Sequence, residues 1–476
     1  MDRAPLVAAL ATYLQSIPGR LHLPAHKGGR WADAEFHKLF TTHPWELDLT
    51  ELPGLDDLHA PIGPLREAQE LAARAFGAAE TLFLVNGSTA GILALILATT
   101  GPGETLVLAR NCHRAATGGL ILSRATPAWV PAEIDARLGL AVGVTPEALE
   151  ETIRAHPAAR AVLLVSPTYQ GFAPDLRALA ATCHARGLPL LVDEAHGPHF
   201  GFHPGFPPPA LAAGADACVQ SLHKAGGSLT GTALLHLAGD RLDRDRVRLM
   251  ASLVQTTSPS FPLLASLDAA RRRLAVHGRG DLDRALNLAA DARSQIRELG
   301  LDCPGTEYAG RPGVAGVDPT RLLVHVGARG ITGYRAEDHL RQQAGVQVEY
   351  ADPANLLALV SPGDEARWLE ALVAGLAGLP RGIDRVLPLA GLLTAIPRAA
   401  LSPAEALDLP RERIPLSLAA GRVAAELVCP YPPGLPVLVP GEVIPPGLPE
   451  TLEALAAAGC RFQGPNPAHQ ELAVLA

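Results

Sequence analysis

The stretch "ETLFLVNGSTAGILALILATT" (residues 80–100) decides the fold class of this chain. It opens with a short apolar run (80–85), turns at Asn86 and Gly87, and continues as an apolar segment long enough for a helix (88–100). A strand buried on both faces and followed at once by a helix is the repeating unit of an α/β protein. We therefore predict a mainly parallel sheet covered by helices.

The same alternation continues on both sides of this stretch. Apolar runs predict strands at residues 80–87, 104–110, 161–168, 189–196, 215–224 and 231–239. Helical spacing predicts helices at residues 64–78, 88–100, 145–156 and 175–187. Polar clusters follow the strand ends, namely "NGST" (86–89), "RNCH" (110–113), "SPTYQG" (166–171), "DEAHGPH" (193–199) and "SLHK" (221–224). Because ligands bind beyond the carboxyl ends of such strands, we expect the functional site at this edge of the sheet.

The C-terminal part of the chain predicts a smaller α+β domain. A helical stretch (281–300) leads into it, and two strand-like runs (320–326 and 355–362) flank a helix (333–345). The proline-rich stretch at 429–447 is too apolar for a linker and is expected to pack against the rest. We predict three parts: an N-terminal helix and arm (1–45), a large domain (46–295) and a C-terminal small domain or domains (296–476).

Composition excludes several classes of protein. The chain has 476 residues, of which 48% are hydrophobic and 18% charged, as in a well-packed soluble globule. Its formal net charge of −8, with no basic run, argues against nucleic acid as the main partner. No uninterrupted apolar stretch reaches ~20 residues, and the first residues read as a short amphipathic helix and not as a signal peptide. We predict a cytoplasmic protein without a membrane partner.

The cysteines carry no metal or disulfide signal. Six are scattered along the chain: Cys112, Cys183, Cys218, Cys303, Cys429 and Cys460. They form no CxxC pair and no Cys/His cluster at metal-ligand spacing. This pattern predicts reduced, mostly buried thiols and no metal site.

The cluster "VNGSTAG" (85–91) places Ser88 and Thr89 at the start of a predicted helix. Backbone N–H groups at a helix N-terminus, together with two hydroxyls, can cradle a phosphate. Taken alone, Ser88 is also the residue type that simply caps a helix. The spacing matches neither the dinucleotide fingerprint nor the P-loop, so both readings stay open at this point.

Two further clusters supply an acid and a lysine. Asp193 and Glu194 follow an apolar strand, where acids act as metal ligands, general bases or partners of a cationic ring nitrogen; a surface turn is the alternative. Lys224 lies at the end of a later strand, where loss of solvent would lower its pKa and leave a neutral amine that reacts with an aldehyde. Its alternative is a solvent-facing loop. A phosphate cradle, an acid and a lysine in this order would together hold a phosphorylated pyridine aldehyde, which predicts pyridoxal 5'-phosphate (PLP) as the cofactor.

Longer motifs extend the pattern over nearly the whole chain. They are "LPAHKGG" (23–29), "DLTELPGLDDLHAPIGPLREAQELAARAFGA" (48–78), "LFLVNGSTAG" (82–91), "SPTYQG" (166–171), "VDEAHGPH" (192–199), "SLHK" (221–224), "TTSPSFPLLASLDAAR" (256–271) and "YPPGLPVLVPGE" (431–442). Through them the chain resembles the short bacterial branch of the Orn/Lys/Arg decarboxylase family, on the aspartate-aminotransferase-like (fold type I) PLP scaffold. The last two motifs distinguish this family from other fold type I enzymes. The resemblance implies an α/β large domain that binds PLP and a smaller α+β C-terminal domain.

The resemblance also implies roles at the cofactor. Lys224 would form the Schiff base, Asp193 would pair with the pyridinium nitrogen, and His113 would stack on the ring, although His113 read alone could be an ordinary loop histidine. The phosphate would be held by Ser88, Thr89, Ser221 and His223. Ala195 and His196 would pack near the ring.

Further roles concern the substrate and a second subunit. Glu442 would contact the distal cation of the substrate, with a surface turn residue as its alternative, and Tyr169 would line the substrate site. Thr257 and Ser258, in "TTSPS", would reach the site of a neighbouring subunit. The resemblance implies a homodimer or a dimer of dimers with the active site at the interface. The segment before "LPAHKGG" leaves no room for the wing domain of the large inducible members.

Two departures from the family pattern stand out. Ala25 replaces the more usual glycine of "GHKGG", and "AGGSLTG" (225–231) follows Lys224 where the family has a glutamine-bearing segment. The second alters packing beside the lysine and weakens any transfer of substrate identity. We interpret Gly226 and Gly227 as letting backbone pass close to the cofactor without a Cβ clash. His26 and Lys27 are expected to line the entrance of the site or to order the arm, without a catalytic role.

The predicted activity is PLP-dependent decarboxylation of a basic amino acid, with L-arginine to agmatine first, then L-lysine to cadaverine or L-ornithine to putrescine. Lys224 or His223 would return a proton to Cα. One alternative is an aminotransferase or aldolase on the same scaffold, in which Arg321 would clamp the substrate carboxylate. A second alternative is a non-catalytic binding or regulatory protein that kept the fold.

Overall fold

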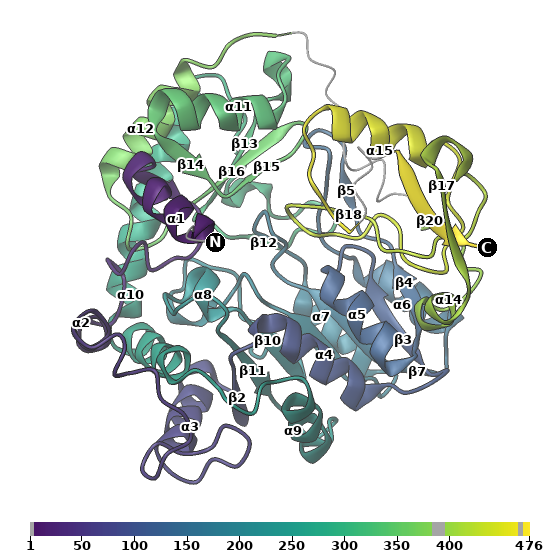
Figure 1. The fold of residues 1–476 in the computed structure, drawn as a ribbon, viewed down its shortest axis with the longest axis horizontal. Helices are drawn as coiled ribbons and strands as arrows, with labels where there is room; N and C mark the ends of the chain where they lie inside the picture. Colours follow the sequence, from purple (N-terminus) through teal and green to yellow (C-terminus); the bar gives the residue numbers. More distant parts are fainter. Residues whose placement is uncertain (1–3, 383–395, 465–469) are drawn as a thin grey trace.

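The computed structural model describes residues 4–382, 396–464 and 470–476 (Figure 1). Its centre is a seven-stranded sheet whose strands lie in the order β2-β11-β10-β9-β7-β3-β4. The bounds are β2 (Glu80–Leu84), β11 (Ala233–Leu237), β10 (Ala217–Gln220), β9 (Leu190–Asp193), β7 (Ala159–Val165), β3 (Thr105–Ala109) and β4 (Thr126–Val130). Only β11 runs antiparallel to its neighbours, so the predicted mainly parallel sheet is confirmed.

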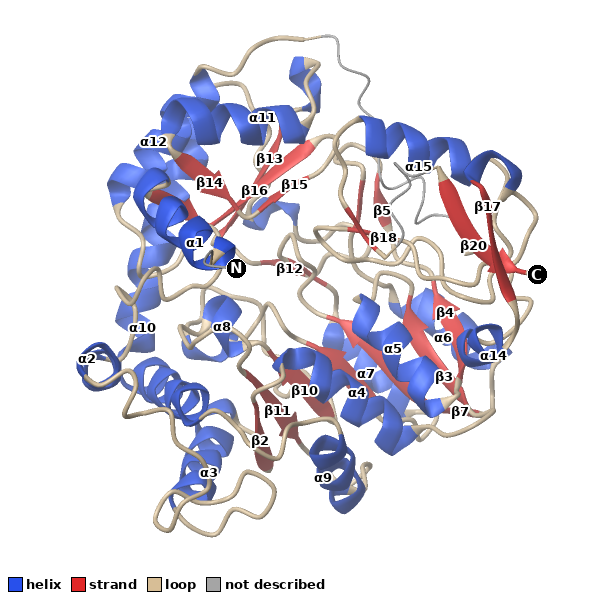
Figure 2. Ribbon diagram, in the orientation of Figure 1, coloured by secondary structure: helices blue, strands red, loops and turns tan. Residues whose placement is uncertain are grey.

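Helices cover both faces of this sheet (Figure 2). On one face, α4 (Gly87–Thr99) packs against α5 (Arg114–Ser123) and α9 (Arg244–Leu253), and on the other α6 (Pro146–Ala155) packs against α7 (Leu176–His184). The apolar side chains of the strands are buried between these layers, as Leu106, Val162 and Leu191 illustrate. This two-sided burial explains why the strands read as continuous apolar runs.

The strands are shorter than their apolar runs predict. The run at 215–224 holds β10 and then a separate short helix, α8 (Leu222–Ala225), that carries Lys224. Within the run at 189–196, β9 likewise ends at Asp193. The hydrogen-bond ladder ends where the polar clusters begin, so these clusters form loops and helix starts beyond the strand ends.

One 38-residue helix, α10 (Phe261–Glu298), joins the large sheet to the smaller domain. Its N-terminal half packs Leu264, Leu267 and Leu274 into the cluster around Phe83. Its C-terminal half packs Ala285, Ala289 and Ile296 into a second cluster. The predicted helical bridge at 281–300 is therefore the second half of a longer helix.

The smaller domain contains a three-stranded sheet of β13 (Arg321–His325), β16 (Asn355–Leu359) and β15 (Tyr350–Ala351). It is covered by α11 (Gly333–His339) and α12 (Ala366–Ala377) (Figure 1). A C-terminal unit follows, with the elements α14 (Pro403–Asp408), β17 (Arg411–Pro415), β18 (Cys429–Pro430), α15 (Leu448–Ala457), β19 (Phe462–Gln463) and β20 (Glu471–Leu475). The proline-rich stretch packs there, with Val437, Leu438 and Ile444 buried. The predicted three-part division of the chain stays a prediction.

Short elements complete the fold. They are α2 (Ala34–Thr42), α3 (Pro64–Phe76), β5 (Ile134–Asp135), β6 (Leu140–Ala141), β8 (Phe172–Ala173) and β12 (Gly316–Val317). At the N-terminus, α1 (Pro5–Ser16) exposes Leu6, Val7, Leu10 and Leu14. The next residues form β1 (Gly19–Leu21), which pairs in parallel with β14 (Val346–Val348) of the smaller domain.

None of the described helices is both long and apolar enough to cross a membrane. Within residues 4–382, 396–464 and 470–476, no group of three or more His, Cys, Asp or Glu side chains is placed to hold a metal ion. The six cysteines are all buried as free thiols in the described chain.

Candidate active site

A cavity of about 610 Å³ opens beyond the carboxyl ends of the central strands. The five polar clusters that follow the strands all contribute to its wall. The predicted site residues that line it are Ser88, Thr89, His113, Tyr169, Asp193, Ala195, His196, Ser221, His223 and Lys224. Residues far apart in sequence therefore meet where the topology of a parallel sheet predicts.

Part of the cavity wall has the chemistry of an anion site. Helix α4 begins at Gly87 with Asn86 at its N-cap, and no side chain caps it among the described residues. Ser88 thus lies in the first turn, so the alternative that it is the cap residue is wrong. Ser221 Oγ is buried, and no described residue forms a hydrogen bond with it. Unpaired backbone N–H groups and an unpaired buried hydroxyl are what a phosphate group requires.

Asp193 and His113 both line the cavity. Asp193 is the last residue of β9, and its Oδ1 accepts a hydrogen bond from Ala195 N at 3.1 Å. Burial raises the pKa of the Asp193 carboxyl, and the nearby Lys224 opposes that rise. His113 caps α5 by accepting a hydrogen bond from Ala115 N at Nδ1 (3.2 Å), and burial lowers its pKa to about 4. His113 is therefore a neutral ring at pH 7.

Lys224 lies on α8 with its Nζ 3.0 Å from Nε2 of His196. Burial lowers the pKa of the lysine, while the Asp193 carboxylate raises it. Burial also holds the pKa of His196 well below its ordinary value, so the imidazole is neutral and its Nε2 accepts a hydrogen bond from Lys224. Within the described chain, His196 Nδ1 has no hydrogen-bond partner. The neutral imidazole therefore positions the Lys224 amine by a hydrogen bond.

The glycines after Lys224 have a different role from the one predicted. A Cβ on Gly226 would lie 2.3 Å from the side chain of Leu222. Gly227 has a φ of +91°, and a Cβ there would lie 3.0 Å from the carbonyl oxygen of Trp31. The close approach is therefore to the N-terminal arm and to the helix itself, and the interpretation of these glycines as cofactor neighbours is corrected.

Glu349 is a residue of the cavity wall that the sequence analysis missed. It lies between β14 and β15 in the smaller domain and lines the cavity beside Val348. Its Oε1 accepts a hydrogen bond from the hydroxyl of Tyr169, and its Oε2 accepts one from Leu23 N at 2.8 Å. The acidic residue in "VQVEYADP" (346–353) was the available signal. Nothing in its sequence position, 125 residues after Lys224, indicates that the two share a cavity.

Glu442 is placed differently from its predicted role. Its carboxylate pairs with the guanidinium of Arg110 at 2.7 and 3.0 Å and accepts a further bond from Val439 N at 2.8 Å. Among the described residues, Glu442 is not one of those that line the main cavity, and only 2% of its surface is exposed. Both oxygens are thus already engaged, and this geometry favours a structural role over a substrate contact.

Replacing Glu442 with Gln is expected to lower stability and leave substrate binding unchanged. The amide keeps one acceptor for Arg110 but leaves a buried guanidinium without its counter-charge, which costs about 1–3 kcal/mol of the free energy of unfolding. Urea unfolding and steady-state KM for the amino-acid substrate measure the two effects. A large rise in KM with unchanged stability would restore Glu442 as a substrate contact.

Thr257, Ser258 and Arg321 also lie off the main cavity wall, as far as the described residues show. Thr257 and Ser258 are exposed on this chain, and their predicted contact with a neighbouring subunit stays a prediction. Arg321 is 3% exposed, donates to Asp318 at 3.1 Å, and donates to the carbonyl of His196 at 3.2 Å. Arg321 therefore supports the loop that carries His196 through Nε and Nη2, while its Nη1 has no hydrogen-bond partner among the described residues and Arg321 lines a small pocket together with Lys224.

A buried polar chain runs behind Asp193, starting at the next residue. Glu194 accepts hydrogen bonds from Ala210 N and from Gln220 Nε2, both at 2.8 Å. Gln220 Oε1 lies 3.1 Å from His236 Nε2, and His236 Nδ1 lies 2.7 Å from the hydroxyl of Thr81. The amide nitrogen of Gln220 donates to Glu194, so its oxygen accepts from His236, which in turn accepts from Thr81. This chain ties β9, β10, β11 and β2 together beneath the site.

The Glu194 carboxyl makes stability depend on pH. Burial raises its pKa to about 7 from an ordinary value of 4.5. Because the folded protein holds this proton more tightly than the unfolded chain, its contribution is complete below about pH 4.5 and is lost as the pH rises through about 7. Because Gln does not titrate, the free energy of unfolding of Glu194→Gln is expected to fall by about 3 kcal/mol less than that of wild type over this pH range. Chemical unfolding at about pH 5 and about pH 8 measures it, with exposed Glu453→Gln as the control, and equal declines in all three proteins would contradict it.

The fold is the one shared by the fold type I class of PLP-dependent enzymes. The constitutive lysine decarboxylase of Escherichia coli has a similar structure, with a TM-score of 0.76 and 22% identity over 100% of this chain and 82% of that one. The serine palmitoyltransferase of Sphingomonas wittichii shares the fold more distantly, with a TM-score of 0.59 and 17% identity over 78% of this chain and 96% of that one.

Sequence comparison identifies the family within this class. The model of the Orn/Lys/Arg decarboxylase major domain matches residues 4–315, and the model of its C-terminal domain matches residues 390–468. The chain belongs to the Orn/Lys/Arg decarboxylase family, as its motifs predicted. It is 40% identical to the arginine decarboxylase of Halalkalibacterium halodurans over 98% of this chain and 96% of that protein. It is 38% identical to the arginine decarboxylase of Bacillus subtilis over 97% and 95%.

Proposed function

We propose that this protein is a PLP-dependent decarboxylase that converts L-arginine to agmatine, with L-lysine and L-ornithine as the next candidate substrates. The observation that carries the proposal is the identity of 38–40%, over nearly the full length of both chains, to proteins named arginine decarboxylase. More distant relatives are named lysine decarboxylases, among them the constitutive enzyme of Escherichia coli at 24% identity. The cavity of this chain contains the functional groups that such a reaction needs.

The cavity fits PLP at each of its three polar positions. The open start of α4 and the unpaired hydroxyl of Ser221 suit the phosphate, Asp193 suits a protonated ring nitrogen, and Lys224 suits the aldehyde. His113 presents a neutral ring to the same space. When bound, PLP supplies an aldehyde that reacts with an amine and a ring that accepts the electron pair left when CO₂ departs from Cα.

The residues of this chain would then move one proton and orient one bond. Decarboxylation replaces the carboxylate on Cα with hydrogen, so the site must supply one proton for each CO₂ released. Lys224 would give its proton to Cα, and the neutral His196, whose Nε2 lies 3.0 Å from the lysine Nζ, would hold the amine in position by accepting a hydrogen bond from it. His223 is the other predicted donor, but its Nδ1 bonds to the carbonyl of Thr232 at 2.9 Å, and its pKa is lowered to about 4 by burial. This favours Lys224 over His223 as the proton donor.

Glu349 would bind the distal cation of the substrate. It is a carboxylate on the cavity wall contributed by the smaller domain, with Tyr169 bonded to it from the larger domain. A planar guanidinium forms paired, charge-assisted hydrogen bonds with a carboxylate, which suits arginine. The predicted substrate role of Tyr169 would then be to hold and orient Glu349.

A homodimer is the proposed assembly, with Thr257 and Ser258 reaching the partner's site. The exposed apolar side chains of α1 support an interface at that helix, since Leu6, Val7, Leu10 and Leu14 are between 57% and 73% exposed on the single chain. The six free, buried thiols support action in a reducing compartment, the cytoplasm.

Supplying the purified protein with PLP and each basic amino acid tests the proposed activity. We expect equimolar CO₂ and agmatine from arginine, with lower rates from lysine and ornithine. Formation of a 2-oxo acid and pyridoxamine phosphate would instead identify an aminotransferase. A protein that binds no PLP and turns over none of the three would be a non-catalytic member of the fold.

A further inference from the structure

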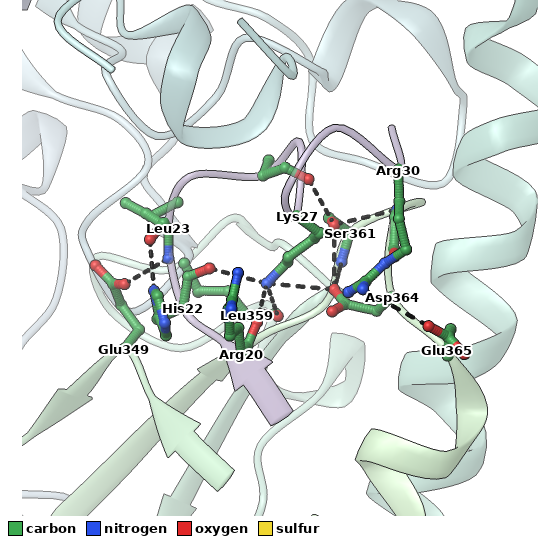
Figure 3. Close-up of polar contacts among 12 residues, drawn as sticks. Arg20, His22, Leu23, Lys27, Arg30, Glu349, Leu359, Ser361, Asp364 and Glu365 are labelled. Atoms are coloured by element: carbon green, nitrogen blue, oxygen red, sulfur yellow. Dashed lines mark hydrogen bonds and ion pairs between the residues drawn. The ribbon is translucent and has the colours of Figure 1, made fainter. Parts of the chain in front are cut away.

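The N-terminal arm, defined here as residues 17–33, lies between the smaller domain and the loop that carries Lys224. Within it, β1 adds to β14 of the smaller domain through the pairs Gly19–Val346 and Leu21–Val348. The arm then turns toward the cavity and buries Trp31, which is 1% exposed. Figure 3 shows this turn, with the side chain of Lys27 pointing into a cluster of oxygen atoms.

The ammonium of Lys27 is buried and surrounded by oxygen atoms. Its Nζ donates to the carbonyls of Arg20 (2.7 Å) and His22 (2.9 Å), both within the arm. It also lies 3.4 Å from the carbonyl of Leu359 and 3.4 Å from Oδ2 of Asp364 in the smaller domain (Figure 3). One side chain, 3% exposed, thus closes the turn of the arm and attaches it to the smaller domain.

The residues facing Lys27 are themselves held in place. Asp364 Oδ2 accepts a hydrogen bond from Ser361 N at 2.8 Å, and Ser361 Oγ lies 2.9 Å from the carbonyl of Ala25 in the arm. Burial lowers the pKa of Lys27, and the Asp364 carboxylate opposes that change. Lys27 has a φ of +51°, a conformation that a side chain adopts only where surrounding contacts compensate for it. These contacts make Lys27 the centre of the attachment.

The choice of lysine at this position is itself informative. Of the 40 cationic side chains in Lys and Arg, only Lys27, Lys38 and Lys224 are lysines. Lys38 is exposed, whereas Lys27 is buried and lines a small pocket that Lys224 also lines. A compact ammonium fits among carbonyl oxygens that converge on one point, whereas a planar guanidinium does not fit there.

The attached arm reaches the proposed active site at two places. Leu23 N donates to Glu349 at 2.8 Å, so the arm holds one oxygen of the carboxylate that faces the substrate. Ala25 N donates to the carbonyl of His223 at 3.2 Å, directly before Lys224. The Lys27 side chain spans both contacts along the arm. Its backbone follows Ala25, and the carbonyls that it binds, those of Arg20 and His22, precede Leu23.

We propose that Lys27 is a positioning residue for substrate binding. By attaching the arm to the smaller domain, it fixes the Leu23 amide against Glu349 and thereby the direction in which this carboxylate faces the cavity. The inference rests on the proposed function, since it assumes that Glu349 binds the distal cation of a basic amino acid. Lys27 itself touches neither the substrate nor the reacting atoms.

Steady-state kinetics of Lys27→Met in the PLP-loaded enzyme test the proposal. Methionine keeps the length of the side chain but leaves the oxygen atoms around it without their donor. We expect KM for arginine to rise about tenfold or more while kcat changes less than about threefold, with the visible absorbance of the bound cofactor unchanged. Arg30→Met is the matched control, because Arg30 joins the same arm to the same loop, through Gly363 O at 3.0 Å and Glu365 at 3.7 Å, but is 41% exposed. Its KM should stay within about twofold of wild type.

Limited trypsin digestion measures how firmly the arm is attached, independently of enzyme activity. Cleavage after Arg20 is available in all variants, and we expect it to be faster in Lys27→Met than in wild type or Arg30→Met. If Lys27→Met does not fold, Asp364→Asn replaces it in both measurements. Asn keeps the size of Asp364 but removes its charge, so we expect the same rise in KM and the same faster cleavage, both smaller. Faster cleavage with unchanged KM, or unchanged cleavage, would overturn the positioning role. If wild type decarboxylates none of the basic amino acids, the proposed function fails on its own, and digestion alone then reports on the attachment.

Discussion

Replacing Lys224 with Ala is expected to abolish decarboxylation, with a fall in kcat of at least about 10⁴-fold. Two roles would be lost together, because the proposed mechanism uses this amine both to react with the aldehyde of PLP and to return the proton to Cα. The neighbouring imidazole of His196 cannot replace either role, since its pKa is held well below its ordinary value and it remains an acceptor. The effect should lie in kcat, with KM little changed.

The measurement is CO₂ release together with the visible spectrum. Wild-type protein should be yellow with PLP and should bleach on treatment with borohydride, which attaches the cofactor covalently to the peptide that contains Lys224. Lys38→Ala is the natural control, because it removes the exposed lysine among the three of this chain. If Lys224→Ala keeps wild-type turnover, or if borohydride labels a different peptide, the assignment of Lys224 is wrong.

Replacing Glu349 with Gln is expected to lower kcat/KM for arginine by about 100- to 1,000-fold. Gln keeps the size and can still accept from Leu23 N, but it removes the negative charge opposite the guanidinium in a partly buried site. The loss should appear mainly as a higher KM, because the distal contact is made in the ground state and in the transition state alike.

Citrulline provides a sharp control for this variant, since its ureido group matches the shape of guanidinium without its charge. Wild type should strongly prefer arginine, and Glu349→Gln should lose most of that preference. Glu442→Gln should retain it, which separates the carboxylate of the cavity wall from the one bonded to Arg110. A preference for arginine that survives in Glu349→Gln but not in Glu442→Gln would reverse the two assignments.

Much of the site could be predicted because its residues follow strands. Ser88, His113, Asp193 and Lys224 each come within a few residues of a strand end, and the carboxyl ends of parallel strands lie at one edge of a sheet. Apolar runs are easy to recognise, so the positions of their ends could be predicted to within a few residues. The chemistry then followed from which residue types gather there.

Residues whose roles depend on long-range contacts were assigned less well. Glu442 is the last residue of a motif typical of the family, yet its role depends on Arg110, which lies 332 residues earlier. Gly227 was interpreted from its nearness to Lys224 in sequence, but its close neighbour is Trp31 of the arm. In both cases the deciding partner is distant in the chain, and no local pattern indicates it.

The sequence by itself determined the α/β class, the edge of the sheet that carries the site, and the residues suited to PLP, because hydrophobic periodicity and strand ends are local properties. The tertiary structure alone decided that Glu349 faces the cavity, that Glu442 pairs with Arg110, and that Lys27 attaches the arm. These three contacts depend on which distant segments pack together. The packing in turn depends on the burial of apolar surface between domains and on the pairing of buried charges. The contact of Leu23 N with Glu349, which joins residues 326 positions apart, exists only once that packing is complete.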